Sequence, residues 1–177
     1  ILRLDIVESL FLKNRFGASY PVLYPDPNTG GNMSENIMTE LVRLDAGGGI
    51  FLDGALWIPA SGGSNTAIVL FPGTGAEYYN SLSAYLGPRL AAVGYTTLSI
   101  NRRDHGVQFG FHTLAEGAAD QGLAIDFLME RGAKQVVAGG HSYGTITVPW
   151  YIAETDDPRV PALLLYAPLG DLRPASV

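Results

Sequence analysis

Short apolar runs alternate with longer amphipathic segments along most of this 177-residue chain. The runs at 67–71 and 162–166 contain no charged residue, which is typical of strands buried on both faces of a sheet. The ranges 40–45 and 50–58 flank a glycine-rich turn and predict a hairpin. In all, strands are predicted over six ranges: 40–45, 50–58, 67–71, 95–100, 135–138 and 162–166.

Three helices are predicted between these strands. The first, over 81–93, has leucines at helical spacing. The second begins at Thr113, which forms a capping-box pattern with Glu116. The third, over 142–154, contains Pro149, which is expected to shorten or kink it. Alternating strands and helices predict an α/β fold with a mostly parallel sheet and helices on both faces.

The N-terminal segment, residues 1–36, has a different pattern. Leu2, Ile6 and Leu10 share a face at helical spacing, so the first seventeen residues predict an amphipathic helix. Charged residues interrupt its apolar part, unlike the core of a secretory signal. A stretch rich in Pro, Gly and Asn follows and predicts a linker. We therefore expect two parts, an N-terminal helix and linker over 1–36 and a core over 37–177.

The composition narrows the class of protein. The chain is 47% hydrophobic and 16% charged, which favours a globular domain over a disordered segment. Its net charge of −6 and its few basic residues argue against nucleic-acid binding. No apolar stretch is long enough for a membrane span. Without cysteine there can be no disulfide or thiolate chemistry, and no cofactor is implied. The sequence does not determine the cellular compartment of the protein, although the cytoplasm is favoured.

The pentapeptide Gly140-His141-Ser142-Tyr143-Gly144 follows a predicted strand and precedes a predicted helix. It matches the G-x-S-x-G pattern, in which a tight turn exposes a serine hydroxyl above the end of the sheet. Ser142 is therefore the predicted nucleophile. The alternatives are a structural glycine-rich turn and a phosphate-binding loop, but the latter requires a lysine where this chain has threonine.

Together with this motif, "LFPGTG" after the third strand and "SINRRDHG" after the fourth make the chain from about residue 39 resemble the alpha/beta-hydrolase superfamily. The resemblance implies a serine hydrolase in which Ser142 attacks an ester or similar acyl bond of a small-molecule substrate. It further implies an oxyanion hole formed by the backbone amides of Thr74 and Tyr143. Asp104 and His105, in the "NRRDHG" turn, correspond to residues that are usually structural in this family.

The base and the acid of a catalytic triad are harder to find. The resemblance implies the chain order serine, acid, histidine, yet His105, His112 and His141 all precede Ser142. His141 is adjacent to the serine in an elbow and is a poor candidate for the base. Asp171 is a weak candidate for the acid. The group Asp104, His105 and His112 lacks the spacing of a recognised metal site.

About six of the family's eight strands can be identified, so we expect the core to be incomplete at its C-terminus. The strand at 162–166 would then be an exposed apolar edge. A later segment or a second chain would complete the sheet and supply the base and acid, and a homodimer is the other partner expected. Asp156 and Asp157 are expected to be solvated helix caps. The alternatives in function are a non-catalytic binding or assembly protein, and a lyase or transferase with the same fold.

Overall fold

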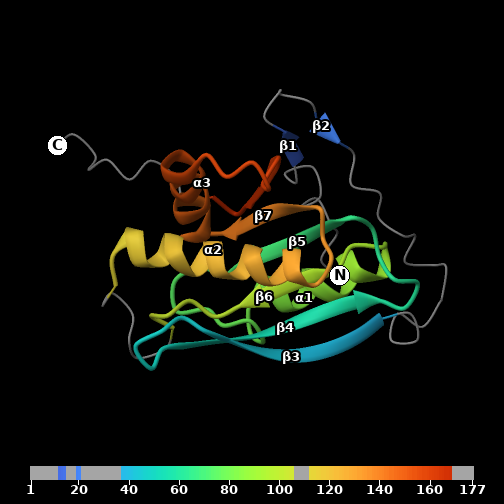
Figure 1. Ribbon diagram of the computed structural model, residues 1–177, viewed down its shortest axis with the longest axis horizontal. Coiled ribbons are helices and arrows are strands. Elements are labelled where there is room, and N and C mark those ends of the chain that lie inside the picture. The colour runs from blue at the N-terminus through green and yellow to red at the C-terminus, as the bar shows by residue number, and fades with distance from the viewer. Residues whose placement is uncertain (1–11, 15–18, 21–36, 106–111, 169–177) are drawn as a thin grey trace, which may run out of the picture.

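The computed structural model describes residues 12–14, 19–20, 37–105 and 112–168. Within these ranges the chain forms one eight-stranded sheet with three helices (Figure 1). All six strands and all three helices predicted from the sequence are present. The elements are β1 (Leu12–Asn14), β2 (Ser19–Tyr20), β3 (Ile37–Asp45), β4 (Phe51–Pro59), β5 (Thr66–Phe71), α1 (Leu82–Ala92), β6 (Thr97–Ile100), α2 (Leu114–Glu130), β7 (Gln135–His141), α3 (Gly144–Thr155) and β8 (Ala162–Tyr166).

The strands are ordered β2-β1-β8-β7-β5-β6-β4-β3 across the sheet. The central strands β8, β7, β5 and β6 are parallel to one another, whereas β4 and β3 add an antiparallel edge. Among the six strands predicted from the sequence, parallel pairings therefore outnumber antiparallel ones. The carboxyl ends of the parallel strands meet at one edge of the sheet, so the loops that follow them are brought together there.

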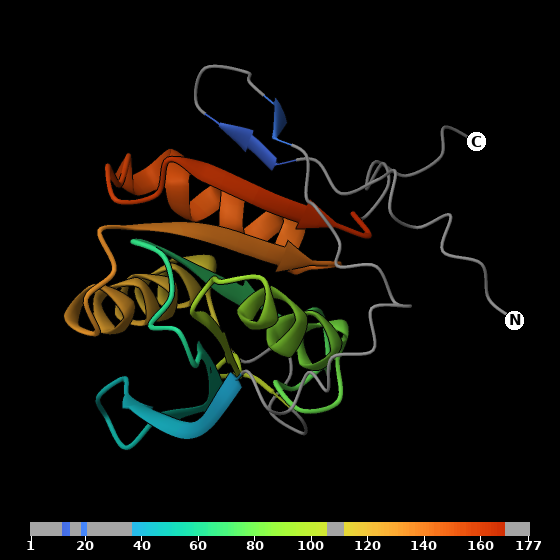
Figure 2. The ribbon, with the colours of Figure 1, turned by 90° about the vertical axis from the view of Figure 1, so that its right-hand side faces the viewer.

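Helices cover both faces of the sheet, as Figure 2 shows, with α1 on one face and α2 and α3 on the other. Alternate residues of β5 pack into the two cores on opposite faces of the sheet. Ile68 and Leu70 pack with Leu86 of α1, whereas Val69 and Phe71 join the core beneath α2 and α3. Because both faces of the central strands are covered, polar positions do not alternate with apolar ones in them, and this accounts for the uninterrupted apolar runs.

The hairpin between β3 and β4 turns at three consecutive glycines. Gly47, Gly48 and Gly49 have φ values of 79°, 60° and 81°. These left-handed angles are disfavoured for residues with a Cβ atom, so the glycine run is a requirement of this turn. Two hydrogen bonds close the turn: the Ala46 amide donates to the Ile50 carbonyl over 2.9 Å, and the Ile50 amide donates to the Gly47 carbonyl over 3.0 Å.

The N-terminal part departs from the prediction. Residues 12–14 form a strand, so the helix predicted over the first seventeen residues is wrong there, and Ser19–Tyr20 form a strand within the predicted linker. β1 pairs antiparallel with β8, Leu12 opposite Leu164. The edge of β8 is therefore not open along its first three residues, contrary to expectation. The rest of 1–36 lies outside the described residues.

Asp157 is also placed differently from the prediction of a solvated cap. Its side chain is only 6% exposed. It accepts a hydrogen bond of 2.5 Å from the Tyr151 hydroxyl and others from the guanidinium of Arg159. Asp156, by contrast, is exposed and ends α3 in a left-handed conformation with φ 48°. Through Tyr151 and Arg159, Asp157 thus joins α3 to the segment that leads into β8.

α3 continues for twelve residues with Pro149 in its interior, so the helix is not cut short at the proline.

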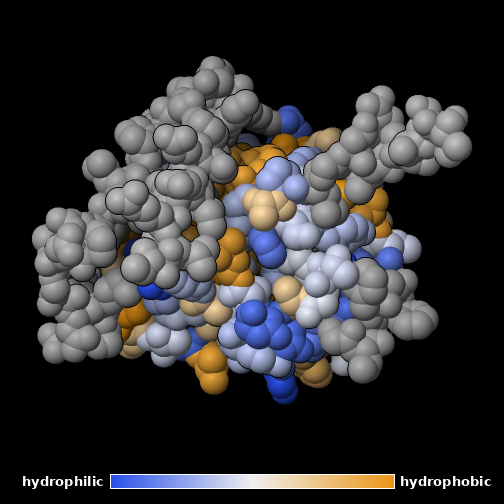
Figure 3. All heavy atoms as spheres, turned by 180° about the vertical axis from the view of Figure 1, so that it is seen from behind, coloured by the Kyte–Doolittle hydropathy of each residue, from blue (hydrophilic) through white to orange (hydrophobic). Residues whose placement is uncertain are grey.

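On the surface, exposed large apolar side chains are dispersed. Seen from behind, they alternate with polar ones over the described residues (Figure 3). None of the helices that the structure describes is both long and apolar enough to cross a membrane.

Candidate active site

Ser142 lies in the two-residue turn between β7 and α3, at the edge where the parallel strands end. Its φ is 50°, a left-handed angle that is unusual for a residue other than glycine. Backbone hydrogen bonds hold this conformation: the Ser142 amide donates to the Tyr166 carbonyl over 3.3 Å, and the Thr145 amide donates to the Ser142 carbonyl over 2.9 Å. The strained turn is thus supported by β8 on one side and by α3 on the other.

The two glycines around Ser142 are required by close packing. A Cβ atom on Gly140 would lie 2.2 Å from the Gly144 carbonyl oxygen, and one on Gly144 would lie 2.7 Å from the Phe71 carbonyl oxygen. Neither approach is possible for a real Cβ without a shift of the backbone. This is the steric reason expected for a G-x-S-x-G turn, in which a strand and a helix pass closely.

The loop after β5 contacts the same turn. A Cβ atom on Gly73 would lie 2.8 Å from the Cβ atom of Ser142. The next residue, Thr74, is exposed. Neither the Thr74 amide nor the Tyr143 amide has a hydrogen-bond acceptor among the described residues. The structure thus brings the predicted oxyanion loop against the predicted nucleophile.

The start of α3 adds a favourable potential for negative charge. Tyr143 is the N-cap residue, and no side chain caps the amides of the first turn. The amides of Thr145 and Ile146 donate to the carbonyls of Ser142 and Tyr143, so the helix dipole is what favours an anion near this end. Ser142 is half-buried and precedes this helix N-terminus directly in the chain.

The histidines are engaged elsewhere. The His141 ring stacks on Tyr166 at a centroid distance of 5.3 Å, and burial lowers the pKa of this imidazole. The Nδ1 atom of His105 lies 2.8 Å from the Arg102 carbonyl oxygen. No histidine of the described ranges forms a hydrogen bond with Ser142. Asp171, the candidate acid, lies outside the described residues.

His112 belongs to a buried polar cluster with Arg102 and Asp104, and the part played by Arg102 was not identified from the sequence. The Nδ1 atom of His112 lies 2.9 Å from Asp104 Oδ2, and its Nε2 atom lies 3.3 Å from Arg102 Nη2. Arg102 in turn donates to Asp104 Oδ2 over 2.8 Å. The side chains of Arg102, Asp104 and His112 are 10%, 2% and 6% exposed. The only signal in the sequence was the group of charged residues in the loop after β6.

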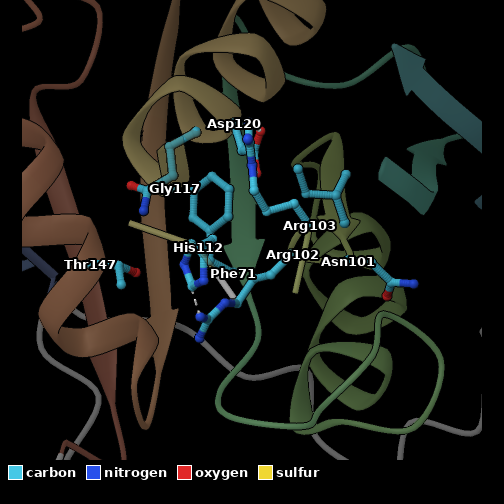
Figure 4. A pocket seen from close by; sticks show the side chains of 10 residues that line it. Phe71, Asn101, Arg102, Arg103, His112, Gly117, Asp120 and Thr147 are labelled. Atoms are coloured by element: carbon cyan, nitrogen blue, oxygen red, sulfur yellow. Dashed lines mark hydrogen bonds and ion pairs between the residues drawn. The ribbon is translucent and has the colours of Figure 1, made fainter. Parts of the chain in front are cut away.

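Arg102 also reaches the turn that carries Ser142. Its guanidinium carbon lies 4.4 Å from the centroid of the Tyr143 ring. Figure 4 shows Arg102 directed toward His112, whereas its neighbour Arg103 extends toward Asp120 on α2. The loop after β6 is therefore attached to α2 and to the Ser142 turn by two adjacent arginines.

Two hollows lie near these arginines, and Ser142 lines neither of them. The first, of about 20 Å³, is lined by Phe71, Asn101 and Arg102 among others and has room for about one water molecule. The second, of about 340 Å³, is an open depression between α2 and the end of β3. Within the described ranges there is no group of three or more side chains that could hold a metal ion.

Comparisons with known proteins were informative only at the level of structure. No protein-family model matches the chain, and no curated protein matches its sequence. A brefeldin A esterase, described as a bacterial homologue of human hormone sensitive lipase, aligns with a TM-score of 0.60 at 20% identity, over 76% of this chain and 39% of that one. A predicted CIB-like hydrolase from Thermoplasma acidophilum aligns with a TM-score of 0.59 at 19% identity, over 75% and 64%.

A third solved structure, a protein of unknown function described by its alpha/beta hydrolase fold, aligns with a TM-score of 0.59 at 13% identity, over 72% of this chain and 43% of that one. This chain thus spans between 39% and 64% of the length of these three proteins. The three TM-scores lie at 0.59–0.60, and at these identities they establish the fold alone. The chain has the alpha/beta-hydrolase fold.

Proposed function

We propose that Ser142 is the nucleophile of a serine hydrolase that cleaves an ester or similar acyl bond of a small molecule. The observation that carries the proposal is the strained φ of 50° at Ser142, in a strand-to-helix turn packed against the loop at Gly73. A non-glycine residue in such a conformation is retained only where the surroundings enforce it. The names of the structural neighbours, an esterase and a hydrolase, support the same reaction class.

In the proposed reaction the Ser142 Oγ atom attacks the carbonyl carbon and forms a tetrahedral intermediate. The amides of Thr74 and Tyr143 donate hydrogen bonds to its negatively charged oxygen, and the N-terminus of α3 adds favourable potential. A histidine base takes the hydroxyl proton and returns it to the leaving group, and a carboxylate orients that histidine. We propose that this histidine and carboxylate come from a portion of the protein outside the present sequence.

A fluorophosphonate probe tests the nucleophile directly. On the intact protein, we expect covalent labelling at Ser142 and none in Ser142→Ala. Ser61→Ala is a suitable control, because Ser61 lies in an exposed turn. Labelling that persists in Ser142→Ala, or a folded intact protein that is not labelled at all, would contradict the proposal.

The alternative is a protein that keeps this fold and uses it for binding or assembly. One observation favours it: His105, His112 and His141 are all held by other partners, so the described residues provide no base for Ser142. A folded intact protein whose Ser142 resists the probe would support this alternative. If the probe does react, analysis of the products of a model ester would separate hydrolysis from acyl transfer or elimination.

A further inference from the structure

Tyr143 contributes a backbone amide to the proposed oxyanion hole, and its side chain is held from outside the turn. The Arg102 guanidinium carbon lies 4.4 Å from the centroid of the Tyr143 ring, a distance typical of a cation–π contact. Arg102 follows β6, whereas Tyr143 follows β7, so this contact joins two loops at the carboxyl edge of the sheet. Tyr143 is adjacent in sequence to Ser142, whose φ of 50° needs support from its surroundings.

Arg102 cannot easily change its own position. It donates to Asp104 Oδ2 over 2.8 Å, and its Nη2 atom lies 3.3 Å from His112 Nε2. The Nδ1 atom of His112 lies 2.9 Å from the same carboxylate. With the arginine side chain only 10% exposed, its planar group is fixed along one edge while one face stays against the tyrosine ring. A guanidinium can serve both contacts together, whereas a lysine ammonium offers no such face.

The neighbouring residue, Arg103, provides a comparison for the role of Arg102, because it attaches the same loop to α2. Arg103 donates to Asp120 over 2.9 and 2.7 Å and to Glu116 over 3.3 Å, and its side chain is 12% exposed. It therefore anchors the same loop to α2 with a similar degree of burial. Arg103 extends toward Asp120 (Figure 4), and among the described residues no hydrogen bond or ion pair joins it to Ser142 or Tyr143. Attachment of the loop to α2 therefore does not require the contact that Arg102 makes.

We propose that Arg102 is a positioning residue for the reaction at Ser142. Locked by Asp104 and His112, its guanidinium holds the Tyr143 ring and so fixes the Tyr143 amide at the point where the oxyanion forms. The proposal rests on the proposed hydrolase function. Its physical basis is that a displacement of about 1 Å in a catalytic group can slow a reaction by about 100-fold.

The test compares Arg102→Lys, Tyr143→Leu, the double variant and the matched control Arg103→Lys in the intact protein. Hydrolysis of a model ester gives kcat and KM, and thermal unfolding gives stability. We expect each single variant at 102 and 143 to lower kcat by roughly 10-fold, since the amide loses its orientation, with KM within about 2-fold. The double variant should lose no more than the worse single variant, because both remove the same contact. Arg103→Lys should lower the unfolding temperature and leave kcat unchanged.

The outcomes separate this proposal from the hydrolase function itself. If the wild-type protein neither reacts with a fluorophosphonate probe nor hydrolyses esters, the function fails. If the wild type reacts but Arg102→Lys loses no more kcat than Arg103→Lys, or if the losses at 102 and 143 multiply, the positioning role is overturned. Should Arg102→Lys not fold, Tyr143→Leu decides alone, because that side chain is only half-buried and an unchanged kcat in it would overturn the proposal.

Discussion

Replacing Gly140 with alanine is expected to distort the turn that carries Ser142. The added Cβ would lie 2.2 Å from the carbonyl oxygen and 2.4 Å from the carbonyl carbon of Gly144, and 3.0 Å from the Thr145 amide nitrogen. Non-bonded carbon atoms settle at about 3.5–4.0 Å, so the start of α3 must move away from the end of β7 by about 1 Å. All three contacts are with backbone atoms, and no side chain can rotate to relieve them.

The size of the effect follows from this displacement. Overpacking of this kind costs about 1–3 kcal/mol. For a chain of this length a cost of about 2 kcal/mol lowers the unfolding temperature by roughly 4–8 °C. A shift of about 1 Å in the position of Ser142 is expected to slow its reaction with a fluorophosphonate probe by about 100-fold. The variant should therefore remain folded at room temperature and react poorly.

Thermal unfolding followed by circular dichroism, and the rate of probe labelling, measure the two effects. Gly122→Ala is the matched control, because a Cβ there would lie 3.8 Å from the Tyr151 ring, an ordinary contact inside α2. It should keep the wild-type labelling rate and raise stability by up to about 1 kcal/mol. If Gly140→Ala unfolds and labels like the wild type, then β7 and α3 do not approach each other as described, and the reasoning is refuted.

Two further predictions concern stability. The pKa of Asp157 is lowered to about 2 because Arg159 donates hydrogen bonds to its carboxylate and Tyr151 adds another. Its contribution of about 2 kcal/mol to the free energy of unfolding is therefore fully present above about pH 4 and lost as the pH falls toward 2. In urea unfolding, the difference in unfolding free energy between the wild type and Asp157→Asn should narrow over this range. A difference that stays constant would contradict the prediction. At the start of α2, Thr113→Ala removes the acceptor for the Glu116 amide and should lower the free energy of unfolding by about 1 kcal/mol. An unchanged urea midpoint of unfolding would show that the capping box contributes nothing to stability.

Local patterns in the sequence were sufficient for β3 to β8, for the three helices and for the turn at Ser142, but not for β1 and β2. The apolar run of β5 predicts a strand buried on both faces, and the pair Thr113 and Glu116 predicts the start of α2, because both depend on residues close together in the chain. The glycines at 140 and 144 predict a close approach of strand and helix for the same reason. The proposed roles of Ser142, Thr74 and Tyr143 stay predictions until a reactive probe is applied.

Contacts between distant parts of the chain were not predictable in this way. The stacking of Arg102 on Tyr143 and the pairing of Asp104 with His112 arise only when the loops after β6 and β7 and the start of α2 meet at one edge of the sheet. Asp157 was predicted to be solvated because an aspartate after a helix usually is. Its burial depends on Tyr151 of α3, six residues earlier in the chain, and on Arg159.

From residue 37 onward, the sequence by itself determined which segments are strands and helices, that the sheet is covered on both faces, and that a strained serine turn lies between β7 and α3. These follow from periodicity and from local sterics, which act over a few residues. Only the tertiary structure decided the strand order, the pairing of β1 with β8, and the partners of the buried charges. Such pairings join segments far apart in the chain, and their free energy comes from burial and charge neutralisation that no single segment contains.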